Sequence, residues 1–559
     1  MSSDISKYSV VDPRIVQQKP KYAVEKGALS ITNQTFSAIA NSASQQTFQV
    51  QVPSENVFID RAIDWVNTTK VLVKLTFTAD PGAVTLATPG VDLSLAPFPV
   101  TQTVSTMQAT INDQSLSINT SDVLPQVLRL ADLAKTRKQR TCPTMLDRYY
   151  DVEPASTYAN SPVGAYDKAF STDEVPCGAW GQLKFYVPTD QAARVELVNG
   201  LPTSKAAYSG TEYTFGVEFS TAEKLVLPPF IFADEDELST GLFGVQNMQF
   251  TMNFNAPGRS LRIAQNALWS VPPVVSWDSA GANGSPFSSA LLQVQFLTPN
   301  LSVPLPAKSI VPWMEFPRYI SPVAEVALGT PAQPVSTDVE SQTITLPMIP
   351  DLLIIFVKPQ SYSSAGGLDP TQADWTLPIQ KISLAFDNFS GLLANHSQYE
   401  LYKMSVNNGL EMDWDEWSGY AWAAGSKTTL VGGPLVLRPG RDFSLSEGQA
   451  PGLIGNFTLQ YNLKLENATG YSYGSAPRSS TAYGAGVSIY TVTANSGFFE
   501  TIKGASRTLR GIVTEQDILG APVSEPVQSM ERMVGEGKHM KHVGPSRHHK
   551  TGLHAYARG

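Results

Sequence analysis

Short segments in which apolar and polar residues alternate dominate this chain. A period of two is typical of strands that bury one face, and the Val, Ile and Thr residues common in these segments favour strands. In the first half the pattern predicts strands at Thr47–Val52, Val57–Ile63, Val71–Phe77, Val104–Ile118, Gln182–Val187, Tyr213–Phe219, Leu225–Phe230 and Met248–Phe254. In the second half it predicts strands at Leu292–Leu297, Val311–Phe316, Gln342–Leu346, Leu352–Val357, Ile379–Phe386, Thr429–Leu437, Asn456–Leu465 and Val487–Thr493. About eight strands in each half indicate an all-β protein.

The clearest succession of elements begins at Ile379. A strand over Ile379–Phe386 is followed by Asp387 and Asn388, residues whose side chains hydrogen-bond nearby backbone and which tolerate the left-handed conformation. Together with Gly391 shortly afterwards, they predict a turn.

A short helix is predicted next. Ser397 and Glu400 have the spacing of a capping box, in which the hydroxyl accepts a backbone N–H of the first turn and the carboxylate binds the N–H of the cap residue. Asn408 and Gly409 supply the left-handed residue with which many helices end.

A similar unit occurs in the first half. The hexapeptide INDQSL at 111–116 precedes a helix predicted to begin at Ser121, as FDNFSG at 386–391 precedes the helix capped by Ser397. The two hexapeptides lie roughly 275 residues apart, about half the length of the chain. This repeat predicts two tandem domains of one fold.

The order of strand, Asp-Asn turn, Ser-Gly-Leu-Leu segment, capped helix, Asn-Gly stop, and Trp414 and Trp417 resembles the second-domain signature of double jelly-roll major capsid proteins. The resemblance is closest to those of polinton-like viruses, adintoviruses and virophages. Residues 350–359 and 433–442 match the same family pattern. The resemblance covers residues 351–521 well and the first half loosely.

The resemblance implies two tandem eight-stranded jelly-roll β-sandwiches with short helices in their loops, a double jelly roll. We therefore expect an N-terminal arm over residues 1–44, a first jelly roll over 45–277, a second over 278–520, and a basic C-terminal tail over 521–559. Loose, Gly- and Ser-rich sequence at 279–289 marks the predicted junction.

The resemblance also implies a function. The chain would be a major capsid protein in the virion, assembled in the infected host cell as homotrimers of pseudo-hexameric outline that tile the icosahedral shell of a double-stranded DNA virus. Its partners would be further copies of itself, penton proteins and minor capsid proteins. The residues expected to hold the second domain's turn and helix are structural rather than catalytic: Asp387, Asn388, Gly391, Ser397, Glu400, Asn408, Gly409 and Trp417.

Composition agrees with an assembly subunit. The 559 residues contain only 16% charged residues, where about 25% is ordinary, and the centres of protein interfaces are depleted in charge. A net charge of −9 argues against a nucleic-acid-binding chain. We expect no signal peptide, no membrane span and no disulfide framework, since only Cys142 and Cys177 are present.

The sequence offers little catalytic chemistry, and we expect no cofactor, no metal and no enzymatic activity. His396 is the only histidine before Met533, so a Ser-His-Asp or Cys-His constellation would depend on this one residue. Its simplest role is that of a turn residue. The acidic run Asp234–Glu237 could hold Ca²⁺, but solvated acidic loops are commoner.

Two other classes of function remain open. Asp413, Asp415 and Glu416 flank Trp414 and Trp417, as carboxylates flank aromatic rings in glycosidase clefts. The chain could therefore be a β-sandwich glycan-binding protein or glycosidase. It could also be a minor jelly-roll vertex or spike protein.

The tail carries a further motif. Met533, Gly535, Glu536 and Gly537 resemble the cleavage site of adenovirus-type maturation proteases, with cleavage expected between Glu536 and Gly537. Glycines on both sides of a bond let an extended backbone enter a narrow groove. The residues beyond include basic but no acidic side chains, and such a segment would be drawn to nucleic acid before removal. An unprocessed, disordered basic tail is the alternative.

Overall fold

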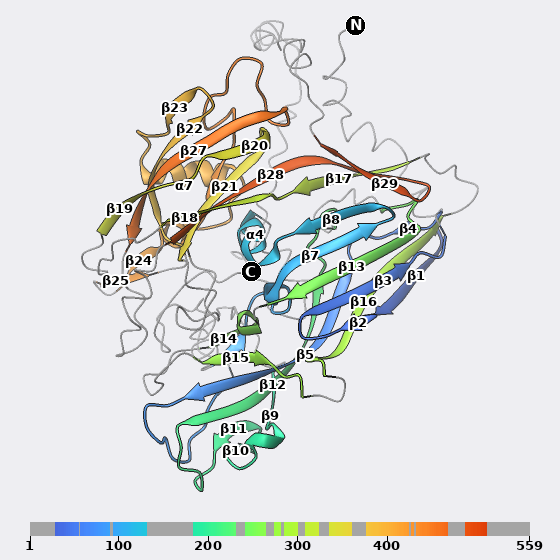
Figure 1. Cartoon of the computed structure of the whole chain (residues 1–559), viewed down its shortest axis with the longest axis vertical. Helices are drawn as coiled ribbons and strands as arrows, with labels where there is room; N and C mark the ends of the chain where they lie inside the picture. The colour runs from blue at the N-terminus through green and yellow to red at the C-terminus, as the bar shows by residue number, and fades with distance from the viewer. Residues whose placement is uncertain are drawn as a thin grey trace, which may run out of the picture.

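The computed structural model describes residues 28–54, 56–89, 93–130, 183–230, 241–255, 257–263, 273–280, 284–299, 308–323, 335–359, 376–423, 426–429, 432–467 and 487–510. Within these ranges it forms two β-sandwiches that lie side by side, the first in blue to green and the second in yellow to red (Figure 1).

The first sandwich is built from two antiparallel sheets. Its eight principal strands are β1 (Ala28–Ser37), β3 (Gln45–Gln51), β5 (Asp64–Thr76), β7 (Val104–Ile111), β8 (Gln114–Ile118), β12 (Glu212–Lys224), β13 (Asn247–Phe254) and β16 (Phe287–Pro299). One sheet has the order β1-β16-β5-β12 and the other the order β3-β13-β7-β8. Along β5 every second residue from Trp65 to Leu75 is buried, which confirms the alternation seen in the sequence.

The second sandwich repeats this connectivity. Its principal strands are β17 (Ser309–Glu315), β19 (Val335–Glu340), β21 (Leu352–Pro359), β22 (Ile379–Phe386), β23 (Phe389–Leu392), β26 (Leu435–Leu437), β27 (Ile454–Asn467) and β28 (Val487–Ile502). The sheets have the orders β17-β28-β21-β26 and β19-β27-β22-β23. Ranked in chain order, the strands of both halves form sheets 1-8-3-6 and 2-7-4-5. Two eight-stranded Greek-key sandwiches in tandem are a double jelly roll, as predicted.

Shorter elements complete the fold. The helices are α4 (Thr120–Val127), α7 (Gln398–Asn407), α8 (Trp414–Ser418), η1 (Thr101–Thr103), η2 (Leu128–Leu130), η3 (Thr189–Gln191) and η4 (Pro257–Ser260). The additional strands are β2 (Ala40–Asn41), β4 (Phe58–Ile59), β6 (Leu93–Leu95), β9 (Lys184–Tyr186), β10 (Val195–Val198), β11 (Leu201–Ser204), β14 (Leu261–Ile263), β15 (Val274–Trp277), β18 (Arg318–Val323), β20 (Ile344–Met348), β24 (Tyr420–Ala423), β25 (Ser426–Thr429) and β29 (Ala505–Arg510).

The structure corrects two predicted boundaries. Residues 28–44 are expected to belong to an arm, yet β1 pairs with β16 over its whole length and β2 pairs with β3. The boundary expected between residues 277 and 278 is also wrong, because β16 pairs with β5 of the first sandwich, so the first domain reaches Pro299. The Gly- and Ser-rich stretch at 279–289 therefore runs into the last strand of the first sandwich rather than dividing the domains.

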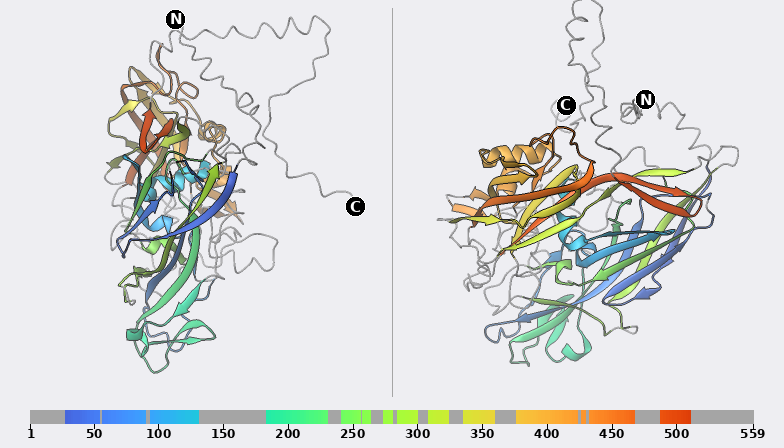
Figure 2. Two further views of the ribbon diagram at one scale, coloured as in Figure 1. Left: turned by 90° about the vertical axis from the view of Figure 1, so that its right-hand side faces the viewer. Right: turned by 45° about the horizontal axis from the view of Figure 1, so that its top comes forward.

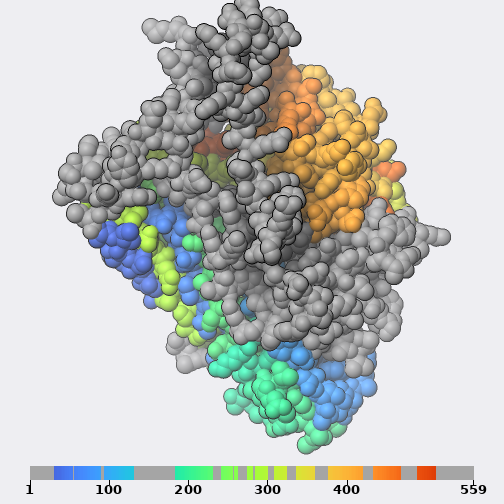
Figure 3. Space-filling view, turned by 180° about the vertical axis from the view of Figure 1, so that it is seen from behind, coloured from blue at the N-terminus to red at the C-terminus, as the bar shows by residue number. Residues whose placement is uncertain are grey.

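The buried apolar side chains of both halves form one continuous cluster. The two views in Figure 2 show α4, in cyan, between the two sandwiches. In Figure 3, seen from behind, the dark blue atoms that begin the first sandwich and the orange atoms of the second lie at the surface. The two sandwiches thus share a core through α4, while other flanks of each remain exposed.

Candidate functional site: the junction of the two sandwiches

The repeated hexapeptides form equivalent corners. In the first half Asn112 and Asp113 connect β7 to β8, and in the second half Asp387 and Asn388 connect β22 to β23. The first residue of each turn is left-handed, with φ of 53° at Asn112 and 49° at Asp387. Two-residue hairpin turns favour Asn and Asp there because these residues tolerate positive φ. Gly391 has φ of 71° but lies within β23, after the turn.

Each corner also holds the neighbouring strand of its own sheet. The Asp387 carboxylate accepts hydrogen bonds from the Thr458 backbone N–H at 2.8 Å and from Nε2 of Gln449 at 3.1 Å. Oδ1 of Asn112 accepts the backbone N–H of Gln246 at 2.8 Å, just before β13. At a corner the strand ends, so the N–H groups of the neighbouring strand lose their backbone acceptors. The side-chain oxygens of Asp387 and Asn112 accept these N–H groups instead.

In the first half the corner also binds the second half. Nδ2 of Asn112 donates to Oγ of Ser506 at 2.8 Å, and the Ser506 backbone N–H donates to Oδ1 of Asp113 at 2.8 Å. Ser506 lies in β29, and the turn before it adds a bond from the Gly504 N–H to the Gly244 carbonyl at 2.8 Å. The β28–β29 hairpin is thereby fastened across the end of the first sandwich.

Helix α7 begins with the predicted capping box. The Glu400 carboxylate accepts the Ser397 backbone N–H at 2.7 Å, and Oγ of Ser397 accepts the Glu400 N–H at 3.4 Å. The hydrogen bonds from Ser397 lower the pKa of Glu400 below its ordinary value. Asn408 is the C-cap and Gly409 follows with φ of 103°, so the predicted helix stop is confirmed.

Polar side chains fasten the inner face of α7 to β26. The buried Oγ of Ser405 accepts the Val436 N–H at 3.0 Å, and Nδ2 of Asn408 donates to the Val436 carbonyl at 3.0 Å and to Asp442 at 2.6 Å. Trp417, also buried, donates from Nε1 to the Pro434 carbonyl at 2.8 Å. A Cβ at Gly433 would lie 2.4 Å from this indole, so a larger residue there would displace the ring.

The acidic and aromatic residues around α8 do not converge on a cleft. The Glu416 side chain is buried and accepts the Asp413 backbone N–H at 3.4 Å, which caps α8, whereas Asp415 is exposed. The rings of Trp414 and Trp417 pack on Tyr402 at centroid distances of 5.4 and 5.6 Å. This arrangement stabilises the helix pair and differs from two carboxylates facing one substrate.

Helix α4 differs from its prediction at its start. Asn119 rather than Ser121 occupies the N-cap position, and its side chain makes no cap bond. Pro125 lies in the second turn and leaves the Ser121 carbonyl without its helical donor. Nη1 of Arg259 donates to that carbonyl at 2.9 Å and so replaces the missing bond.

Helix α4 and η2 contact the second sandwich through polar groups at both ends. Asp122 forms an ion pair with Arg318 of β18. Farther along, the Glu411 backbone N–H donates to the Arg129 carbonyl at 2.9 Å, and Nη1 of Arg129 lies 3.4 Å from Sδ of Met412. These pairings could not be predicted from the sequence, because the partners lie far apart in the chain.

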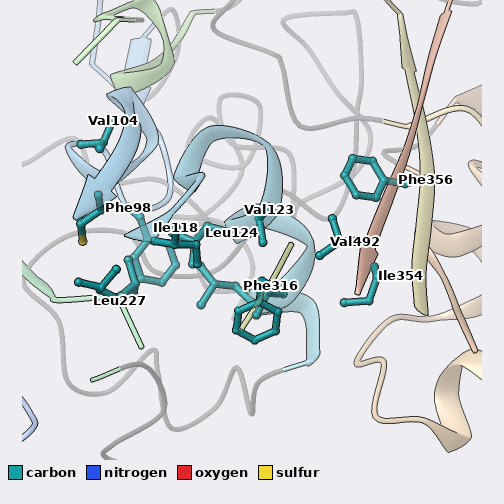
Figure 4. Close-up of a cluster of buried hydrophobic side chains, with 14 of the residues drawn as sticks. Phe98, Val104, Ile118, Val123, Leu124, Leu227, Phe316, Ile354, Phe356 and Val492 are labelled. Atoms are coloured by element: carbon teal, nitrogen blue, oxygen red, sulfur yellow. The ribbon is translucent and has the colours of Figure 1, made fainter. Parts of the chain in front are cut away.

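Between these contacts an apolar surface is buried. Val123 of α4 and Phe316 lie beside Ile354, Phe356 and Val492, which project from β21 and β28 (Figure 4). The alternate residues of the same strands face the interior of the second sandwich, where Thr491 bonds the hydroxyl of Tyr461 on the opposite sheet. Strand β21 is therefore buried on both faces, which explains its unbroken apolar run.

Of the remaining candidate residues, only His396 lies in the part of the chain that the structure describes. His396 is half-buried, and its backbone N–H donates to the Leu393 carbonyl at 3.1 Å, as in a turn. The Asp234–Glu237 run, Cys142, Cys177 and the Met533–Gly537 motif lie outside the described residues. Among those the structure describes, no group of His, Cys, Asp or Glu side chains is arranged to bind a metal ion. Nor does this part of the chain contain a helix of the length and hydropathy that crossing a membrane requires.

Comparison with known families decides between the alternatives. A family model described as the first domain of the Sputnik virophage major capsid protein matches residues 3–297, more than half of the chain. The chain belongs to this family of major capsid proteins. A model for the C-terminal domain of major capsid protein V20 matches residues 316–497. The first match ends within β16, in agreement with the corrected boundary, and the second begins directly after β17.

Individual relatives agree. Capsid protein V20 of Sputnik virophage is 26% identical over 483 residues, which are 83% of this chain and 74% of that protein. The chain in the Sputnik virophage cryo-EM structure superposes with a TM-score of 0.70 at 22% identity, over 91% of this chain and 94% of that one. The mavirus major capsid protein superposes with a TM-score of 0.64 at 13% identity, over 88% and 92%.

Membership of this family identifies the general function of the chain. The chain is a major capsid protein of a virus and a component of the virion. In this chain, the junction described above sets how the two sandwiches stand relative to one another.

Replacing Asn112 tests the clamp at this junction. Asn112→Gly retains a residue that accepts positive φ but removes side-chain bonds to Gln246, Gly244 and Ser506. We expect a loss of about 1–3 kcal/mol, measured by thermal unfolding. The control is Asn199→Gly, because Asn199 has the same φ of 53° in the exposed β10–β11 turn. Equal stability of the two variants would contradict the clamp.

Replacing Ser397 tests the capping box. Ser397→Ala is expected to destabilise α7 by about 1 kcal/mol, because one backbone N–H of the first turn loses its acceptor. Hydrogen exchange of the amides at 398–401 should become faster, while Ser390→Ala in the exposed strand β23 should leave them unchanged. Unaltered exchange in Ser397→Ala would show that the cap does not hold the helix.

Proposed function

We propose that this capsid protein forms homotrimers of pseudo-hexameric outline, and that these trimers tile an icosahedral shell. The observation that carries the proposal is the identical strand order, 1-8-3-6 and 2-7-4-5, of the two sandwiches. Three copies present six similar sandwiches, so a trimer suits positions of local sixfold symmetry.

The chemistry of the chain supports a purely structural role. The carboxylates of Asp413 and Glu416 and the polar groups of both corners are engaged in caps and backbone hydrogen bonds. Within the described residues they leave no arrangement of nucleophile and base. We propose accordingly that the protein is not an enzyme, and that its partners are further copies together with penton and minor capsid proteins.

Processing of the tail is a separate part of the proposal. The Met533–Gly537 motif lies beyond β29, the last strand described, so a protease could reach it without opening either sandwich. We propose that an adenovirus-type protease cuts between Glu536 and Gly537, and that the basic segment contacts nucleic acid before its removal.

The trimer is tested by the mass of the purified full-length chain. Sedimentation equilibrium should give three times 60.4 kDa, about 181 kDa, and negative-stain images should show hexagonal particles with threefold symmetry. The interfaces should be of obligate size, roughly 2,000 Å² or more, so the trimer should persist at submicromolar concentration. A stable monomer would contradict the proposal.

Cleavage is tested by intact-mass measurement of the protein from purified particles. The expected species ends at Glu536, and particles carrying Gly537→Val should retain the full tail, because a β-branched residue does not fit the narrow groove that glycine allows. Gly544→Val, also in the tail but outside the motif, is the control and should be processed normally. Unmodified particles whose chain still ends at Gly559 would show that the tail is not removed.

A further inference from the structure

Strands β17, β28 and β29 form a three-stranded ribbon, with β28 in the middle, that reaches from the second sandwich along the end of the first (Figure 1). The inner face of the ribbon packs on the first sandwich. Val311, Trp313 and Phe499 are buried there, and the Thr501 hydroxyl donates to the Phe243 carbonyl. The first sandwich therefore covers one face of the ribbon.

The outer face of the ribbon is apolar and exposed. Ile310 and Met314 alternate with the buried residues of β17, and they are 43% and 37% exposed. Phe498 and Ile502 do the same in β28, at 36% and 39%. The register completes the patch, which we call the apolar ribbon face: Ile310, Pro312, Met314, Phe498, Ile502 and Leu509. A contiguous apolar patch of this kind marks a surface that another segment or molecule covers.

The charges around the apolar ribbon face favour an acidic occupant. Lys308 and Arg507 flank Glu500 at 3.3 and 2.9 Å and stay 47% and 60% exposed. Lys503, exposed in the turn of the β28–β29 hairpin, has no ion-pair partner among the described residues. At the other end of the face, the Asp351 carboxylate accepts a backbone N–H of β28 at 2.7 Å. Both carboxylates are thus already engaged, and the positive charge is in excess.

The sequence directly after β29 has this chemistry. Strand β29 ends at Arg510, within the ribbon itself, and the next ten residues are GIVTEQDILG, 511–520. They combine four large apolar side chains with two acidic and no basic ones: Ile512, Val513, Ile518, Leu519, Glu515 and Asp517. An extended chain advances about 3.3 Å per residue. Ten residues are therefore enough to turn and recross the positions from Gly497 to Ile502, which β28 pairs with β29.

The other terminal segments have the wrong charge for this face. Residues 1–27 contain five basic and three acidic side chains, and residues 521–559 contain six basic and three acidic ones. Either segment would bring further positive charge to Lys308, Arg507 and Lys503, and like charges repel across a contact. Charge therefore selects residues 511–520.

We propose that residues 511–520 turn back at the end of β29 and cover the apolar ribbon face of their own chain. The contact removes apolar side chains of both partners from water and places Glu515 and Asp517 among the cations of the ribbon. Because it lies within one chain, it depends neither on the proposed trimer nor on cleavage. The bond between Glu536 and Gly537 lies beyond the segment, so the segment stays in place whether or not the tail is cut.

Hydrogen exchange of the full-length chain tests the contact. The amides of residues 512–519 should exchange at least about tenfold more slowly than those of residues 521–532, because a docked segment must open before it exchanges. Met314→Glu removes an apolar contact and repels the acidic segment, so it should abolish this difference while the amides of β5 stay protected. The control is Ile454→Glu, on the exposed start of β27 in the other sheet, which should leave the segment protected.

Two results of this experiment would overturn the inference. One is exchange of residues 512–519 as fast as that of residues 521–532 in the wild type, which is also the result expected if a second copy or a membrane covers the face instead. The other is protection that persists in Met314→Glu, which would mean that the segment docks elsewhere.

A variant outside both sandwiches separates docking from misfolding. Ile518→Asp should uncover Met314, so that hydrogen peroxide oxidises this thioether several-fold faster than in the wild type, since the oxidation of methionine follows its exposure. The control is Val527→Asp, farther along the tail, which should leave the rate unchanged. Peptide mapping by mass spectrometry measures both rates. Equal oxidation of Met314 in the two variants would contradict the docking.

Discussion

Burial of the outer face of β21 and β28 beneath α4 is the constraint on which the rest of this structure depends. Ile354, Phe356 and Val492 are fully buried although they point out of their own sandwich. At roughly 1.5–3 kcal/mol for each large apolar side chain removed from water, this contact outweighs single surface hydrogen bonds. It joins two complete jelly rolls into one body, and the polar contacts at Asn112, Asp122 and Arg129 then fix the angle between them.

The sequence predicts local features of this fold better than its long-range pairings. The Ser397–Glu400 box and the Asn408–Gly409 stop are confirmed because each depends on residues within one turn of a helix. The unbroken apolar run of β21 predicts a strand, but periodicity does not say which second surface covers it. That surface is α4, more than 200 positions earlier in the chain.

The two wrong boundaries have the same origin. In β1 the sequence ALSITNQTFS lies at a sheet edge, where one-sided exposure weakens the alternation, and it resembles an arm. In β16 the strand itself is predicted correctly, but a jelly roll places its last strand between the first and the third, so a loose segment before it does not mark a domain end. The N-cap of α4 is misplaced because Asn and Ser are about equally favoured as caps, so composition does not choose between Asn119 and Ser121. The start is set instead by Thr120, whose hydroxyl bonds the Val104 carbonyl.

The equivalent outer faces of the two sandwiches differ in composition, and the difference follows from which of them α4 covers. The face in the second half is covered as soon as the chain folds, because its partner is tethered to it, and it is correspondingly apolar. Over the described residues, no helix covers the face in the first half as α4 covers the second, and a large apolar patch exposed to water would promote aggregation. Thr, Asn, Gln and Ser together with a few aliphatic side chains give this face a polar composition that suits contact with water.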